Sequence, residues 1–279
     1  MLTILLSSMT SLLFGCSDFL GGLASRRDSA FAVTANAHLL GLAILGVAVL
    51  LFPAPFHPAD LVWGAAAGVS GGIGVAALYG ALALGRMGVV APITAALSGS
   101  LPALYDLARG TSLRPLSLAG LAVALVAIVV VSASGHPDER AEMPPRAIAL
   151  ALLAGVGFSG GLIFFSFASK TGGLMPLVAA RVVSVVLLMT ISFARRGTAR
   201  LAPDALPSAL GAGALDVAAN VTMLAAIRIG PLAVASVLGS LYPVVTILLA
   251  RSVLGERLRP VQRAGVVLAL AAVMLTAIR

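Results

Sequence analysis

Residues 205–226 read ALPSALGAGALDVAANVTMLAA. An apolar segment of ~20 residues crosses a hydrocarbon core of roughly 30 Å as an α-helix. Asp216 lies at the centre of this segment, and Asn220 follows one helical turn later on the same face. A carboxylate near the bilayer midplane is costly and usually faces a polar cavity or a partner. We therefore expect a spanning helix whose Asp216–Asn220 face borders a binding site.

The composition of the whole chain also indicates a membrane protein. Apolar residues make up 60% of the 279 residues, charged residues only 10%, and the mean hydropathy is +1.10. A soluble domain carries about 25% charged residues. The predicted fold class is therefore an all-α integral membrane protein, because spanning β-strands alternate polar and apolar residues in ~10-residue segments. Ten stretches are long and apolar enough to span: 2–22, 31–52, 61–84, 89–107, 116–134, 147–168, 174–194, 205–226, 231–250 and 263–278.

Charge and cysteine content exclude several classes of function. The net charge is +8, but the arginines are scattered at the ends of the spans and form no basic face with interleaved aromatics, so nucleic acid is not an expected partner. Cys16 is the only cysteine, which allows no intrachain disulfide and no cysteine-based metal cage. We expect no metal and no cofactor. The first span lacks a positive segment before it, so we expect it to be a retained helix.

The chain repeats itself. Four blocks in the first half recur in the same order in the second half, at spacings of 142 to 145 residues. The matched pairs are Gly110–Pro115 with Gly255–Pro260, Gly85–Gly88 with Ile227–Gly230, Phe14 with Phe158, and Ala24-Ser25 with Ala168-Ser169; Pro102 and Pro243 also fall near corresponding points. This pattern predicts a first repeat over 1–134, a polar connector over 135–146 and a second repeat over 147–279.

Duplication of five spans has a physical consequence. An odd number of spans places the second copy upside down in the membrane, so the two repeats are related by an axis in the membrane plane. Inverted repeats of this kind allow two states open to opposite sides, with a site at the interface between the repeats. Because one chain contains both repeats, a monomer is sufficient, and a dimer is not excluded.

Several motifs resemble one known family. Gly213-Ala-Leu-Asp-Val-Ala-Ala-Asn220, Gly230-Pro231, Ser240-Leu-Tyr-Pro-Val-Val-Thr246 and Leu254-Gly-Glu-Arg257 resemble the EamA-type branch of the drug/metabolite transporter superfamily, and Phe14-Gly-Cys-Ser-Asp-Phe-Leu-Gly-Gly22 looks like its first-helix pattern. The first half departs from the pattern at Thr111, where the second copy has Glu256. The resemblance implies ten helices in a 5+5 inverted repeat and export or exchange of small metabolites, often amino acids.

Three charged residues within the spans are candidate binding or coupling residues. Asp216, with Asn220, is suited to a cationic group of the substrate or to a proton. Arg181 lies about a turn from the centre of 174–194 and either binds a substrate carboxylate or pairs with a buried acid, Asp216 or Asp18. Asp18 either lines the cavity or marks the end of its helix, and these two interpretations remain open.

Hydroxyl-bearing residues and prolines complete the predicted site. Tyr79 and Tyr242 are candidate walls of the pocket, since each offers an aromatic face and a hydroxyl. Ser98 and Ser240 precede Pro102 and Pro243 and are placed to satisfy the carbonyl groups that a proline frees. We expect both prolines to interrupt their helices, as matched interruptions point to the binding site of a transporter.

These observations predict a secondary transporter, an exporter or exchanger of small organic metabolites, working by alternating access in the cell (inner) membrane as a multi-pass protein. Its partners are a small uncharged or zwitterionic substrate and the lipid bilayer, with protons as a candidate coupling ion. It is not expected to be an enzyme. The alternatives are a flippase of lipid or lipid-linked sugar and, less favoured, an intramembrane enzyme.

Orientation in the membrane is left open by the sequence. Ten arginines lie in the connectors after the odd-numbered spans, against four basic residues after the even-numbered spans and Arg279 at the tail. The positive-inside rule therefore places both termini outside. The family resemblance implies that both termini lie inside.

Overall fold

The computed structural model describes residues 1–85, 87–132, 144–254 and 260–277. Within these ranges the chain forms eleven α-helices and no β-strand. The helices are α1 (Leu2–Ser25), α2 (Ala30–Leu51), α3 (Pro58–Leu84), α4 (Met87–Ala108), α5 (Pro115–Ser132), α6 (Pro145–Ser166), α7 (Met175–Arg196), α8 (Leu206–Ile229), α9 (Leu232–Gly239), α10 (Tyr242–Leu254) and α11 (Pro260–Ala277).

The helices have the length and hydropathy of a membrane protein. Among the described residues, seven stretches are long and apolar enough to span a bilayer, and one of them, Leu232–Val253, covers both α9 and α10. Helices suit this environment because every interior backbone group is paired within the segment. The expectation of an all-α membrane protein is thus confirmed.

The two prolines expected to interrupt their helices behave differently. The predicted span 231–250 is divided into α9 and α10, which are separated at Ser240 and Leu241, and Pro243 is the second residue of α10. A proline is tolerated there because the first helical N–H groups have no partner in the helix. At Pro102 the predicted interruption is wrong, since α4 continues through it to Ala108. A proline inside a helix costs one hydrogen bond, here to the carbonyl of Ser98, without always ending the helix.

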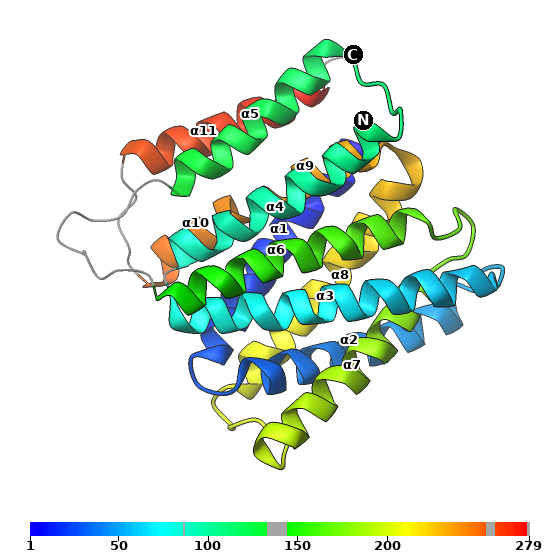
Figure 1. Ribbon diagram of the computed structural model, residues 1–279, viewed down its shortest axis with the longest axis vertical. Helices are drawn as coiled ribbons and strands as arrows, with labels where there is room; N and C mark the ends of the chain where they lie inside the picture. Colours follow the sequence, from blue (N-terminus) through cyan, green and yellow to red (C-terminus); the bar gives the residue numbers. More distant parts are fainter. Residues whose placement is uncertain (86, 133–143, 255–259, 278–279) are drawn as a thin grey trace.

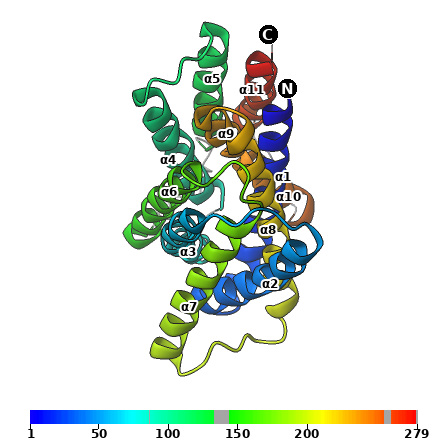
Figure 2. The same ribbon diagram turned by 90° about the vertical axis from the view of Figure 1, so that its right-hand side faces the viewer.

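The helices pack in a pattern that relates the two halves of the chain. In the centre of the molecule, α3 packs along α6 and α1 packs along α8 (Figure 1). In turn, α4 lies against α6, and α1 lies against α9 and α10. At one margin α5 packs against α11, and at the other α2 and α7 cover the central helices (Figures 1 and 2).

Small residues permit the close central packing. Gly68 faces the backbone of Ala180 so closely that a Cβ atom there would overlap it, and Gly213 faces Ala37 in the same way. Close approach at small residues is the usual basis of helix association in membranes, where no hydrophobic force drives helices together. In α3 this close approach occurs at Gly68, whereas a Cβ atom at Gly71 would meet open space.

Two carboxylates at helix ends accept hydrogen bonds from distant parts of the chain. The Asp60 carboxylate, fully buried at the start of α3, accepts hydrogen bonds from the backbone N and Oγ of Ser169, both at 2.7 Å. Asp106 at the end of α4 accepts a 2.8 Å bond from the backbone N of Ala233 in α9. Most of the predicted connector 135–146, and the segment 255–259 that includes Glu256, lie outside the described residues.

Candidate functional site

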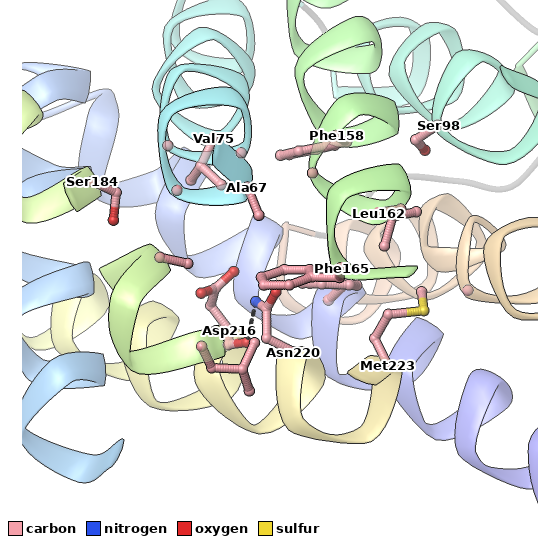
Figure 3. Close-up of a pocket in the computed structure, with 18 of the residues that line it drawn as sticks. Ala67, Val75, Ser98, Phe158, Leu162, Phe165, Ser184, Asp216, Asn220 and Met223 are labelled. Atoms are coloured by element: carbon pink, nitrogen blue, oxygen red, sulfur yellow. Dashed lines mark hydrogen bonds between the residues drawn. The ribbon is translucent and has the colours of Figure 1, made fainter. Parts of the chain in front are cut away.

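A cavity of about 90 Å³ lies among the central helices. Its walls come from both halves of the chain, namely from α1, α2, α3, α4, α6, α7, α8, α9 and α10. Figure 3 shows Asp216, Asn220 and Met223 projecting from α8, with Phe158, Leu162 and Phe165 projecting from α6. The polar lining residues are Asp18, His38, Ser98, Arg181, Ser184, Asp216, Asn220, Ser236, Ser240 and Tyr242. The cavity therefore brings together seven of the eight side chains that the sequence predicted for the site.

An ion pair between α7 and α8 forms the charged centre of the cavity. The guanidinium Nη2 of Arg181 donates to Oδ2 of Asp216, and both side chains are less than 10% exposed. Of the two roles considered for Arg181, pairing with Asp216 is the one that the structure contains. One turn along α8, the amide of Asn220 donates to the backbone carbonyl of Asp216 at 2.8 Å. The Asp216–Asn220 face of α8 therefore borders the cavity.

Asp18 is a second buried carboxylate on the cavity wall. It is 5% exposed and, among the described residues, makes no hydrogen bond and no ion pair. The charge of Asp216 acts on it unfavourably, since both groups are acidic. Of the two interpretations left open by the sequence, the structure places Asp18 on the cavity wall. Its neighbour Ser17 faces α8 and donates to the carbonyl of Ala212 at 2.9 Å.

His38 of α2 also lines the cavity, and its ring contacts α7. Its Nδ1 lies 2.8 Å from Oγ of Ser184, and this hydroxyl also lies 3.2 Å from the carbonyl oxygen of Arg181. A hydroxyl that donates to a carbonyl must accept from the ring, so the proton of His38 is assigned to Nδ1. Nε2 is then an acceptor, and it is buried without a hydrogen-bond partner among the residues that the structure describes.

Two serines meet where the helices of the two halves cross. The hydroxyl oxygens of Ser98 on α4 and Ser240 after α9 lie 3.3 Å apart. Ser240 also donates to the carbonyl of Ser236 at 2.6 Å, across the end of α9. Nearby, the hydroxyl of Tyr242 points to the carbonyl of Ala91 at 3.4 Å. These residues therefore contribute hydroxyl groups to the wall of the cavity.

Tyr79 is not part of the cavity wall, and this expectation needs correction. The side chain is 1% exposed and lies against Gly21 of α1, where the ring occupies the space that a Cβ atom would need. Its hydroxyl lies 3.5 Å from Oγ of Ser17. The glycine opposite Tyr79 therefore makes the ring a packing element between α3 and α1.

Some wall residues were not predicted. Phe14 and Phe158 both line the cavity and are related by the repeat spacing of 144, which is the signal that would have found them. His38 and Ser184 carry no such signal, because their pairing depends on how α2 packs against α7. Among the described residues, no group of three or more His, Cys, Asp or Glu side chains is placed to hold a metal ion.

These features define a helical membrane protein with a charged cavity lined by both halves of the chain. Residues 145–278 match the model of the EamA-like transporter family. The second half of the chain is thus an EamA-like transporter domain, and this match supports the EamA-type transporter of the drug/metabolite transporter superfamily that the sequence motifs predicted.

Comparison with solved structures supports the fold over the whole chain. One crystal structure of a protein superposes with a TM-score of 0.72 at 18% sequence identity, covering 96% of this chain and 94% of the other. At this identity the likeness shows a shared fold and no shared substrate. Among curated proteins, none matches the chain.

Proposed function

We propose that the protein is a secondary transporter that exports or exchanges small organic metabolites across the cell (inner) membrane by alternating access. The observation that carries this proposal is the buried cavity in which Asp216, Asn220, Arg181 and Asp18 converge from three helices. Ionisable groups at membrane depth are costly and are retained mainly along substrate or ion pathways. The volume of about 90 Å³ suits a small solute better than a lipid.

The arrangement of the helices supports two inverted five-helix repeats, residues 1–134 and 147–279. If α1 to α5 correspond to α6 to α11, with α9 and α10 counted as one interrupted helix, the packing of α3 on α6 corresponds to that of α8 on α1. The packing of α4 on α6 likewise corresponds to that of α9 and α10 on α1. Repeats related in this way exchange conformations between two states of similar energy, and the site at their interface then faces each side in turn.

Flux through purified protein in liposomes tests this function. A panel of amino acids, amines, purines and sugars is offered to vesicles containing the protein, and uptake of each labelled solute is measured. We expect accelerated flux of at least one small solute, driven by its own gradient or by a proton gradient. Flux no faster than in protein-free vesicles for every solute would contradict the proposal.

The variant Asp216→Asn locates the transport path. We expect it to lose flux while remaining folded in detergent, because the amide cannot carry the charge that holds Arg181 or a cationic ligand. Asp204→Asn is the matched control, since the side chain of Asp204 is 64% exposed and lies outside the cavity. Unchanged flux through Asp216→Asn would remove this residue from the mechanism.

A further inference from the structure

The charges on the cavity wall do not balance, and this imbalance bears on the substrate. Arg181 and Asp216 neutralise each other in their ion pair. Asp18 adds a second carboxylate to the same cavity and has no ion-pair partner in the part of the chain that the structure describes. With His38 neutral and both acids ionised, the wall carries one net negative charge.

Burial makes this charge expensive without a counter-ion. A buried charge is tolerated when it is paired, and an isolated one is strongly unfavourable in a medium of low dielectric constant. Asp18 is 5% exposed, so little solvent compensates its charge. The cavity therefore requires one additional positive charge, which a proton or a bound cation can supply.

Hydrogen bonding indicates the same chemistry. The Asp18 carboxylate lines the cavity and accepts no hydrogen bond among the described residues, so it is free to accept from a ligand. Arg181, in contrast, already donates to Asp216. A protonated amine has several N–H donors and one positive charge, whereas a carboxylate ligand would add a second negative charge.

The groups around Asp18 do not supply the additional positive charge, so Asp18 is the position at which that charge binds. From the helices packed against α1, the titratable side chains that act on Asp18 are Asp216 on α8, Tyr79 on α3 and Tyr242 on α10. His38 on α2 and Arg181 on α7 line the same cavity. On the neighbouring α9, the cavity-lining polar residue Ser236 does not titrate, and on α11 Arg263 is exposed. Of these groups, only Arg181 is a cation, and it is committed to Asp216.

Resting on the transport function proposed above, we propose that the cavity selects a small organic monocation, whose ammonium group binds the Asp18 carboxylate, and that a proton occupies Asp18 when the amine leaves. One proton is then released for each amine bound, and the protein is an amine/proton exchanger. This substrate class differs from the uncharged or zwitterionic metabolite that the sparse charges of the sequence suggested.

Three compounds that share an isobutyl group test the charge requirement. Isoamylamine is a monocation, leucine is the corresponding zwitterion, and 4-methylpentanoate is the corresponding anion. Titration calorimetry on purified protein is expected to give the lowest Kd for isoamylamine, with leucine at least tenfold weaker and 4-methylpentanoate without measurable binding. Because an alkylamine titrates near pH ~10, like lysine, its charge is constant between pH 6 and 8.

The pH dependence and one variant test the role of Asp18. In the pH range in which a proton and isoamylamine compete for Asp18, we expect the Kd of isoamylamine to rise by up to tenfold for each unit that the pH falls. Asp18→Asn is expected to weaken binding by at least tenfold and to abolish this dependence, while Asp204→Asn changes neither. If Asp18→Asn does not fold, the comparison of the three compounds and the pH series on the unaltered protein still decide the question.

The outcomes separate this inference from the transport function. Binding and flux of leucine equal to or better than those of isoamylamine, with no pH dependence, would overturn the monocation assignment and leave the transporter standing. Flux of no compound in the broad panel would contradict the transport function itself.

Discussion

The hydroxyl oxygens of Ser98 and Ser240 lie 3.3 Å apart, although the residues are 142 positions apart in the sequence. This separation equals the spacing of the Gly85–Gly88 and Ile227–Gly230 blocks, so in the proposed repeat each serine is the counterpart of the other. Two equivalent residues can touch only near the axis that relates the repeats. The contact therefore marks the centre of the proposed inverted repeat, at the wall of the cavity.

The ion pair between Arg181 and Asp216 is expected to serve transport and not only stability. Removing one partner from a buried pair costs about 3–5 kcal/mol, whereas replacing both by apolar residues of similar volume is often neutral. We predict that Arg181→Met combined with Asp216→Leu keeps the melting temperature within a few degrees of the original and abolishes flux. Thermal unfolding and liposome flux on the same preparation check this, and normal flux through the double variant would make the pair purely structural.

Gly21 is predicted to be intolerant of any side chain because Tyr79 fills the space beside it. Overpacking of this kind costs typically about 1–3 kcal/mol. We expect Gly21→Ala to lower the free energy of unfolding by that amount, and Tyr79→Ala to remove most of this additional cost in a double-mutant cycle. Gly46→Ala is the control, since a Cβ atom there meets nothing within 4 Å. Equal effects of the two glycine substitutions would refute the contact.

Asp28, in the connector between α1 and α2, is predicted to stabilise the protein only while it is ionised. Burial tends to raise its pKa, but hydrogen bonds from the backbone N of Ala202 and Ser29 and from Arg196 outweigh burial and hold the pKa below its usual value. A lowered pKa contributes stability above the unfolded pKa of about 3.9, which is lost as the pH falls through the folded value.

The variant Asp28→Asn tests whether Asp28 stabilises the protein only while it is ionised. At pH 7 we expect the variant to be less stable by about 1.5–3 kcal/mol, the usual worth of hydrogen bonds to a charged group. The difference in melting temperature between the variant and the original should begin to shrink as the pH falls below about 4, and it should vanish only below the lowered pKa of the folded state, where Asp28 is neutral as well. A difference that stays constant between pH 7 and pH 3 would contradict an ionic contribution.

The sequence predicted the helices well because long apolar segments leave few alternatives in a membrane. The structure adds what depends on packing between distant helices. The pairing of Arg181 with Asp216 was one of two possibilities, and only the crossing of α7 and α8 decides it. Tyr79 was assigned to the cavity wall because a tyrosine offers an aromatic face and a hydroxyl. Its ring instead occupies the space beside Gly21 of α1, so Tyr79 packs between α3 and α1. Pro102 and Pro243 looked equivalent, although only Pro243 follows an interruption.

The measurement that tests alternating access most directly is the accessibility of Ser240 from the two sides of the membrane. In a Cys16→Ala background, Ser240→Cys is treated with a membrane-impermeant thiol reagent added to one side or the other of sealed vesicles. Ser252→Cys is the control, because Ser252 is exposed near the end of α10. We predict that the cysteine at 240 reacts from both sides and is protected by substrate, while the control reacts from one side only. Reaction of the cysteine at 240 from a single side, in protein that still transports, would contradict the account.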